Sequence, residues 1–331
     1  MNLKKVLIMK NDKLFEILQS NIEKRIQYWL QCNKSLYIPI KYILKAGGKR
    51  IRPLITLLSA ESVGGNFNNA IDLAVAIEFL HTFTLIHDDI MDHSDKRRGH
   101  KTIHEKWDEN TAILAGDFLS GLSYNTILNA SNKRIIEILK VFTNAYIVVC
   151  EGQNEDMEFS NKKFISMDNY LEMIKKKTAV LISASAEIGA LAGGGATVEV
   201  KALREFGLNL GMAFQIKDDI LDIIGNQSKL GKPRYQDIFE GKKTYLFIKA
   251  LEMADRKEKR FLLEFYNKKP VTGEFVNKIK KLYFDLGIIE EGETEVSKYS
   301  NIAKGKLDVL KNTEAKNCLI MLTDKITSRN Y

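Results

Sequence analysis

Apolar residues recur at intervals of three and four along almost the whole chain, and the alternation typical of β-strands is rare. There are only four prolines, at Pro39, Pro53, Pro233 and Pro270. Because proline disrupts a helix interior and three-and-four spacing places apolar side chains on one helix face, the pattern predicts long amphipathic helices. The predicted fold class is therefore all-α, a bundle of long helices.

A chain of 331 residues suits one large domain or two ordinary ones. No linker separates two halves, so we expect residues 1–331 to form a single domain. The formal net charge is +8, but lysines and acidic residues are interleaved along the whole chain. Such mixed charge is typical of solvated helix faces, and without a motif of basic and aromatic residues it argues against a nucleic-acid partner.

The three cysteines, at Cys32, Cys150 and Cys318, have no metal-type spacing and are odd in number. This usage favours a reducing compartment over a disulfide framework. The N-terminus has two lysines and a short apolar patch but no core of signal-peptide length. No stretch reaches the roughly 20 apolar residues of a membrane span. We expect a cytoplasmic protein without a membrane span.

Two aspartate clusters of the same form lie far apart, at Asp88–Asp92 (DDIMD) and Asp218–Asp222 (DDILD). Each follows an apolar run with helical spacing, so its first and last aspartates project from one helix face, one turn apart. Carboxylates gathered in this way repel one another unless cations share the site. Oxygen-only ligands suit Mg²⁺, which binds through one or two carboxylates together with substrate phosphates. The clusters therefore predict a magnesium-dependent site for a diphosphate ester.

Cationic segments accompany both clusters. Residues 46–53 read AGGKRIRP, where the glycines permit a close approach of backbone to ligand and the proline suits the first turn of a helix. A phosphate at that helix start would meet amide donors and cationic side chains. A P-loop needs a different order of residues and a preceding strand. In the lysine run 175–177 we expect Lys177, beside Thr178 and a row of small residues, to point inward.

All five histidines fall within one short span, which raises a second interpretation. His100 and His104 have the spacing of a zinc-binding pair, and His87 beside Asp88 is compatible with a histidine-aspartate metal phosphohydrolase. That chemistry would leave the second aspartate cluster and the cationic segment 46–53 without a role. We therefore treat it as the alternative from a different class.

The order of these motifs resembles that of the trans-isoprenyl diphosphate synthases, continuously from Gly47 to Thr244. Besides the two aspartate clusters, the shared motifs are GGKxxRP at 47–53, RRG at 97–99, LAGD at 114–117, EGQxxD at 151–156, KT at 177–178 and FQxxDD at 214–219. Class I terpene cyclases share the first aspartate motif but carry an Asn/Asp-Ser/Thr-Glu pattern at the second site. This chain has a full aspartate motif there, so the resemblance implies chain elongation rather than cyclisation.

The resemblance implies an all-α isoprenoid-synthase bundle around a deep central cavity, usually as a homodimer. It implies Mg²⁺ as cofactor, with three ions in each active site, and isopentenyl diphosphate and allylic diphosphates as substrates. The metal ligands would be Asp88, Asp92 and Asp218, with Asp89, Asp219 and Asp222 completing the clusters. The allylic diphosphate would be bound by Arg97, Lys177, Gln215, Lys232 and Lys242. Isopentenyl diphosphate would be bound by Lys49, Arg52, His81 and Arg98.

The reaction that the resemblance implies begins with ionisation of the allylic diphosphate. Cations would stabilise the departing diphosphate, and a dry cavity would protect the carbocation from water. Thr178 and Gln215 would place negative dipole ends near the carbocation while the double bond of isopentenyl diphosphate attacks it. A proton would then leave to the released diphosphate, without a protein base. The chain departs from the family's pattern at Tyr235, where a glycine is common, and its tail around Arg329 is similar only loosely.

Product length depends on the helix that leads into the first cluster. At about 1.5 Å per residue, Phe83 lies roughly 7.5 Å before Asp88 along the helix axis, and Leu80 nearly one turn further. A single aromatic at Phe83 followed by the small Thr84, with no two-residue insertion in the first motif, resembles the type I geranylgeranyl diphosphate synthases. We expect mainly a twenty-carbon product, with the fifteen-carbon diphosphate as intermediate or co-product. A farnesyl diphosphate synthase is the alternative within the family, and a Phe83 that merely packs in the core is the simpler interpretation.

Overall fold

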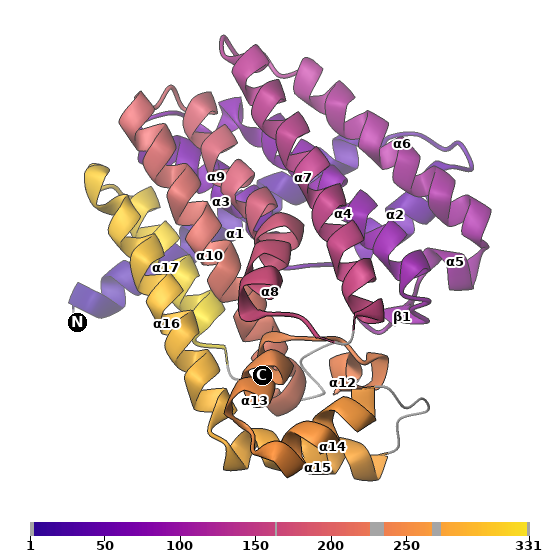
Figure 1. The fold of residues 1–331 in the computed structure, drawn as a ribbon. Helices are drawn as coiled ribbons and strands as arrows, with labels where there is room; N and C mark the ends of the chain where they lie inside the picture. The colour runs from indigo at the N-terminus through magenta and orange to yellow at the C-terminus, as the bar shows by residue number, and fades with distance from the viewer. Residues whose placement is uncertain (1–2, 163, 226–234, 267–272, 330–331) are drawn as a thin grey trace. The chain divides into compact units, whose positions relative to one another are not determined.

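The computed structural model describes residues 3–162, 164–225, 235–266 and 273–329, and these residues are almost entirely helical (Figure 1). The prediction of an all-α fold is confirmed. The helices are α1 (Leu3–Trp29), α2 (Tyr37–Lys45), α3 (Ile51–Ser62), η1 (Phe67–Asn69), α4 (Ile71–Met91), α5 (Ile103–Lys106), α6 (Glu109–Leu128), α7 (Ile135–Asn161), α8 (Met167–Ile174), η2 (Lys175–Ala179), α9 (Val180–Ala192), α10 (Thr197–Ile224), α12 (Gln236–Glu240), α13 (Tyr245–Met253), α14 (Arg256–Tyr266), α15 (Gly273–Asp285), α16 (Ile288–Lys306), η3 (Leu307–Val309) and α17 (Glu314–Thr327). Two short strands, β1 (Lys96–Arg97) and β2 (His100–Lys101), form an antiparallel hairpin.

The chain forms two compact units, and each unit contains one of the aspartate motifs. Unit 1 comprises residues 1–146, 181–207 and 304–322, and unit 2 comprises residues 147–180, 208–303 and 323–331. The first motif, at 88–92, therefore belongs to unit 1, and the second, at 218–222, to unit 2. The chain enters each unit more than once.

The central helix of unit 1 is α4, which packs against α6, α3 and α1. Every residue from Leu73 to Leu80 is buried, as expected for a helix that is apolar on nearly all sides. Glu78 is the one charged residue in that stretch, and a buried carboxylate requires a partner. Helices α4 and α6 approach closely because Gly116 lacks a side chain: a Cβ there would lie 2.3 Å from the His87 imidazole. This packing fixes the end of α4, where the first motif lies.

The core of unit 2 is built around α13, which packs against α8, α14 and α15. The C-terminal part of α10 contributes Ile216, Ile220 and Ile223 to the same core. On α16, Gly292 faces this part of α10, since a Cβ there would lie 2.9 Å from Cδ1 of Ile220. Lys217 is buried on α10 and its ammonium lies 2.6 Å from a carboxylate oxygen of Glu293. These contacts fix the helix that carries the second motif.

Candidate active site

The first aspartate motif lies at the C-terminal end of α4, where Asp88 and Asp92 are partly exposed. Asp89 differs, because only 2% of it is exposed and Arg97 donates from Nε to both of its oxygens, at 2.8 and 3.0 Å. Burial raises the pKa of the Asp89 carboxyl, and Arg97 offsets part of that rise. The motif therefore presents two partly exposed carboxylates one turn apart and uses the third to hold β1.

The hairpin of β1 and β2 was not predicted from the sequence, and it explains the arrangement of the Arg-Arg-Gly motif. Arg98 and Gly99 form its two-residue loop, with φ angles of 53° and 79°. Positive φ at both positions defines a type I′ turn, whose twist matches that of a hairpin. The turn separates the two arginines: Arg97 binds Asp89, and Arg98 donates to the carbonyl of Gly47.

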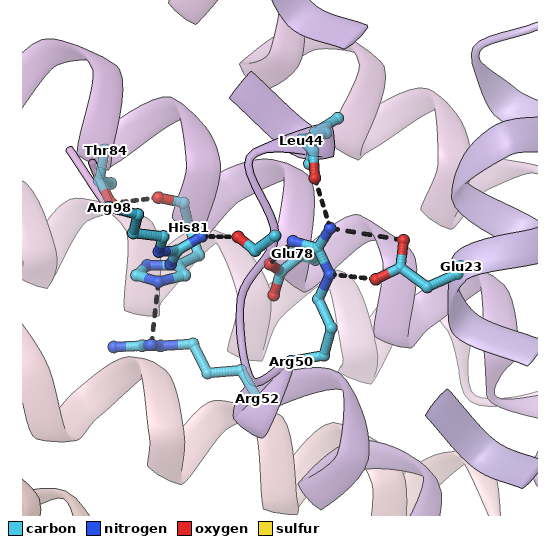
Figure 2. A network of polar contacts seen from close by, with 9 residues as sticks. Glu23, Leu44, Arg50, Arg52, Glu78, His81, Thr84 and Arg98 are labelled. Atoms are coloured by element: carbon cyan, nitrogen blue, oxygen red, sulfur yellow. Dashed lines mark hydrogen bonds and ion pairs between the residues drawn. The ribbon is translucent and has the colours of Figure 1, made fainter. Parts of the chain in front are cut away.

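The glycine pair before α3 accommodates Arg98. Gly47 has a φ of 81°, a conformation that residues with a Cβ rarely adopt. At Gly48 a Cβ would lie 2.7 Å from Nη1 of Arg98. The two glycines were expected to admit a ligand, and in the structure they admit this guanidinium, which lies against the backbone (Figure 2).

Arg50 lies in the same segment but has a structural role. It is 3% exposed, and it donates to Glu78 at 2.6 Å, to Glu23 at 2.7 Å and to the carbonyl of Leu44 at 2.7 Å (Figure 2). Glu78 is thereby neutralised inside unit 1. Because Arg50 is held on three sides, it fixes the position at which α3 begins and so positions Arg52.

Arg52 and His81 meet across α3 and α4, with Nη1 of Arg52 3.1 Å from Nε2 of His81 (Figure 2). Because a guanidinium only donates, Nε2 of His81 accepts and Nδ1 carries the proton. Burial, together with Arg52, Arg98 and Arg97, holds the pKa of His81 well below its usual range. A neutral imidazole lies beside arginines without repulsion. Unit 1 thus brings together Arg52, His81 and Arg98, and Lys49 is exposed on the same segment.

In unit 2 the lysine run forms a π-turn, η2, between α8 and α9. Single π-turns interrupt the α-helical register and are frequent at functional sites. Two glycines let neighbouring helices approach it closely. A Cβ at Gly152 would lie 2.3 Å from the backbone nitrogen of Lys177, and one at Gly211 would lie 2.4 Å from Cα of Ala179. The π-turn is therefore held between α7 and α10.

The three lysines of η2 differ in their surroundings, and Lys177 differs from the other two as expected. Lys175 and Lys176 pair with the glutamates Glu172 and Glu155. Nζ of Lys177 instead donates to Asp156 at 2.6 Å, and Lys177 and Thr178 line a cavity of unit 2 whose volume is about 190 Å³. The wall of this cavity also includes four further residues assigned to the site from the sequence: Gln215, Asp218, Asp219 and Lys242.

The three aspartates of the second motif have different surroundings. The Asp218 side chain is 38% exposed, and Nη2 of Arg329 lies 2.9 Å from one of its oxygens. Asp219 is 4% exposed, and burial together with the nearby Asp237 raises its pKa to about 7. Asp222 is fully buried and accepts a hydrogen bond from the backbone N–H of Asp237 at 3.3 Å. Only Asp218 combines exposure with a place on the cavity wall.

Lys242 lies on the cavity wall and forms an ion pair with Glu240 at 2.8 Å. Lys232, predicted to bind the allylic diphosphate, lies outside the described residues. Sequence reasoning did not assign Tyr170 or Lys243, both of which line the cavity. It also missed Arg329, which is 8% exposed and lies 4.8 Å above the ring of Phe214. The motifs assigned to the site contain neither Tyr170 nor Lys243, and the only signal for Arg329 was the loose similarity of the tail to the family's pattern.

The residues predicted to control product length lie on α4. Phe83 is 7% exposed, and its ring makes edge contacts with His87 and Tyr146 at centroid distances of 4.7 and 5.3 Å. Leu80 is buried, and the hydroxyl of Thr84 donates to the backbone carbonyl of His81. Phe83 is therefore held by aromatic neighbours within unit 1.

The histidine-rich span does not form a metal site in the part of the chain that the structure describes. His87 packs on Gly116, and His100 lies on β2 whereas His104 lies on α5. Among the described residues, no three His, Cys, Asp or Glu side chains converge closely enough to hold an ion by themselves. Any ion here would need further ligands, which is how Mg²⁺ binds when substrate phosphates complete its shell.

Comparison with known proteins gives the family. A sequence profile described as polyprenyl synthetase matches residues 33–283. The chain belongs to the polyprenyl synthetase family. A geranylgeranyl diphosphate synthase of Methanosarcina mazei is 39% identical over 300 residues, which cover 90% of this chain and 91% of that protein. A geranylfarnesyl diphosphate synthase of Aeropyrum pernix is 38% identical over 297 residues, covering 87% of this chain and 92% of that protein.

The crystal structure of a geranylgeranyl pyrophosphate synthetase from Pyrococcus horikoshii superposes with a TM-score of 0.90 at 36% identity, covering 97% of this chain and 99% of that chain. Membership of the polyprenyl synthetase family confirms the resemblance identified from the motifs and makes the protein an enzyme of the trans-prenyltransferase type. The histidine-aspartate phosphohydrolase alternative is not favoured. None of the described helices combines the length and apolar composition that crossing a bilayer requires.

Proposed function

We propose that the protein condenses isopentenyl diphosphate with allylic diphosphates and releases mainly the twenty-carbon diphosphate. The observation that carries this proposal is the cavity of unit 2, whose wall holds Asp218 together with the cations Lys177 and Lys242. In all, four aspartates and three lysines line this cavity, and such a mixture of charges suits a diphosphate that binds together with metal ions. Membership of the polyprenyl synthetase family supports the same reaction class.

The donor set fits Mg²⁺, because Asp88, Asp92 and Asp218 offer only oxygen and are partly exposed. Both motifs lie near helix C-termini, where the helix dipole disfavours carboxylates and so favours a bound cation. When bound, the ions would neutralise charge on the departing diphosphate. We propose three ions in each site. The remaining aspartates of the two motifs are buried: Asp89, Asp219 and Asp222. We propose that they hold the motifs in position through contacts within the protein.

The cations of the two units have separate tasks in this proposal. Arg52, His81 and Arg98, with Lys49, would bind isopentenyl diphosphate, since guanidinium groups grip phosphate oxygens at two points. A neutral His81 would donate one hydrogen bond without adding charge. In unit 2, Lys177, Lys242 and Gln215 would bind the allylic diphosphate. Arg97, which belongs to unit 1, and Lys232, which lies outside the described residues, are proposed to assist because they match the family's motifs.

The proposed reaction leaves an allylic carbocation in the cavity after the diphosphate departs. Met173 and Ile174 supply an apolar part of the cavity wall, where exclusion of water would keep the carbocation from being quenched. The oxygen of Thr178 would lie towards the cation. The double bond of isopentenyl diphosphate forms the new carbon–carbon bond, and the proton that is lost passes to the released diphosphate.

We propose that Phe83 limits the length of the product. Because His87 and Tyr146 hold its ring from two sides, the Phe83 ring would be a fixed rather than a mobile obstacle to the lengthening prenyl chain. The relatives include proteins named for twenty-carbon and for twenty-five-carbon products, so product length varies among proteins of similar identity to this chain. The fifteen-carbon diphosphate is then an intermediate or co-product.

We also propose a cytoplasmic homodimer in which residues 1–331 act as one catalytic domain. Large apolar side chains are exposed along α6 at Ile113, Leu114 and Leu128, with exposed fractions of 43, 57 and 65%. Exposed apolar side chains of this size suit contact with a second copy of the chain. Repeated passage of the chain between its two units favours one folding domain, and a reducing compartment suits three cysteines that form no disulfide in the described chain.

The decisive experiment incubates the enzyme with Mg²⁺, isopentenyl diphosphate and dimethylallyl diphosphate, followed by chromatography of the dephosphorylated products. We expect mainly a twenty-carbon alcohol. Phe83→Ala should shift the distribution to longer products, whereas Phe79→Ala, one turn earlier in the core of α4, should reduce stability without lengthening them. Wild-type products of thirty carbons or more, or an unchanged distribution for Phe83→Ala, would overturn the proposed role of Phe83.

A further inference from the structure

Asp219 is the centre of a hydrogen-bond network that ends at the cavity. One of its carboxylate oxygens accepts from the Tyr170 hydroxyl at 2.6 Å and from the backbone N–H of Tyr245 at 2.9 Å. The other oxygen accepts from Nε2 of Gln215 at 3.0 Å. The hydroxyl of Thr178 in turn donates to Oε1 of Gln215 at 2.8 Å. All five residues belong to unit 2.

The polarity of this network follows from the chemistry of Asp219. Nε2 of Gln215 faces one Asp219 oxygen, while the other oxygen already accepts from Tyr170 and Tyr245, so the Gln215 side chain presents its NH₂ group to the carboxyl group. The amide oxygen of Gln215 then faces Thr178, and the Thr178 hydroxyl must donate. With its proton committed to Gln215, the Thr178 oxygen has its lone pairs available to the cavity that Thr178 lines. Reversing the amide would set Oε1 of Gln215 against the carboxylate.

The surroundings of Asp219 also separate it from its neighbour Asp218. Three donors occupy its two oxygens, and only 4% of the residue is exposed. Successive residues on a helix point about 100° apart, so two adjacent aspartates face different surroundings. Asp218 is 38% exposed in its side chain and is the member of the pair suited to a metal ion.

We infer that Asp219 is a positioning residue: it sets the direction of the Gln215 amide and thereby turns the oxygen of Thr178, and not its proton, towards the reacting allylic carbon. This inference deepens the proposed function and rests on it. A hydroxyl proton directed at a developing carbocation would oppose ionisation, whereas the lone pairs of a fixed oxygen stabilise it. The Asp219 carboxylate therefore acts through two hydrogen bonds rather than through a metal.

The inference is tested by exchanging the hydrogen-bond donor and acceptor between positions 215 and 219. In Asp219→Asn the new NH₂ group faces Gln215, which must turn its oxygen towards it and its NH₂ group towards Thr178, so the hydroxyl is reversed. We expect kcat for condensation to fall about 100-fold, as for loss of one oriented dipole in an active site. In the double variant Asp219→Asn with Gln215→Glu, the asparagine donates to the glutamate and the glutamate accepts from Thr178. We expect at least about tenfold recovery of kcat over Asp219→Asn.

Three controls distinguish orientation of the Gln215 amide by Asp219 from other roles of Asp219. Asp222→Asn has the same charge change in the same motif, and combining it with Gln215→Glu should multiply the two losses without recovery. Asp218→Asn should raise the Mg²⁺ concentration needed for half-maximal rate, and Asp219→Asn should not. Thr178→Val should lower kcat about tenfold in the wild-type background and have no further effect beside Asp219→Asn.

Thermal unfolding gives a readout that does not depend on turnover. The double variant should have a higher melting temperature than is predicted by adding the changes in melting temperature of Asp219→Asn and Gln215→Glu, because it restores the hydrogen bond between positions 215 and 219. The inference is overturned if the exchange recovers neither rate nor melting temperature, or if Asp219→Asn raises the Mg²⁺ requirement as Asp218→Asn does. If the wild-type enzyme condenses no prenyl substrate, the proposed function fails, and the melting data still decide the orientation of Gln215.

Discussion

Arg50→Met should unfold the protein more easily without acting on substrate binding directly. Arg50 is 3% exposed, and its guanidinium faces Glu78, whose side chain is 5% exposed. Removing one partner of a buried ion pair leaves an uncompensated charge and costs about 3–5 kcal/mol. For 331 residues the entropy of unfolding is about 0.7 kcal/mol per kelvin, so the melting temperature should fall by roughly 4–7 °C.

The matched comparison is Arg52→Met, two residues later in the same motif. Arg52 is partly exposed and contacts His81, so its loss should change the melting temperature by less than about 2 °C, as for most sites away from buried charges. It should instead raise KM for isopentenyl diphosphate. Adding Glu78→Gln to Arg50→Met removes the orphaned charge and should restore part of the stability. An Arg50→Met protein that melts like the wild type but has a raised KM would show that Arg50 contacts substrate and would refute this reasoning.

Other predictions concern pH, packing and the separation of the two substrates. Folded His81 stays neutral while an unfolded histidine takes up a proton below about pH 6.5, so the unfolding free energy should fall as pH drops below that value and level off above it. Urea titrations at several pH values should show this dependence flattened in His81→Gln. Gly152→Ala should displace the backbone of Lys177 and lower kcat at least about tenfold, whereas Gly305→Ala, which meets open space, should not. In steady-state kinetics Lys49→Ala should chiefly raise KM for isopentenyl diphosphate, and Lys177→Ala that for the allylic substrate.

The helices were predictable because their apolar spacing is a local property of the sequence. The two apolar runs that lead into the aspartate clusters, expected to be helical, form α4 (Ile71–Met91) and α10 (Thr197–Ile224). The lysine run 175–177 lies in the π-turn η2, which the apolar pattern did not show. That turn depends on Gly152 and Gly211 of neighbouring helices, so its cause lies outside the segment.

The residue types of the candidate site were also predictable, but the internal partners of those residues were not. Asp89 lies eight residues from Arg97, Asp219 lies 49 residues from Tyr170, and Asp218 lies 111 residues from Arg329. A motif states which groups are present and not which of them are already bound within the protein. Arg50 and Arg52 illustrate this: both lie in one short motif, but Arg50 is buried and bound to Glu78, whereas Arg52 is partly exposed beside His81.

The two aspartate motifs are alike at their second aspartate and differ at their last, and this difference bears on the metal. In each motif the second aspartate is buried and bound by the protein: Asp89 by Arg97, and Asp219 by three donors. The first motif retains two partly exposed carboxylates, at Asp88 and Asp92, at the C-terminal end of α4. In the second motif the last aspartate is fully buried, so Asp218 alone is exposed. Since Mg²⁺ takes few protein carboxylates and prefers phosphate and water for the rest of its shell, such sparse donor sets favour ions that bind together with a diphosphate over ions held permanently by the protein.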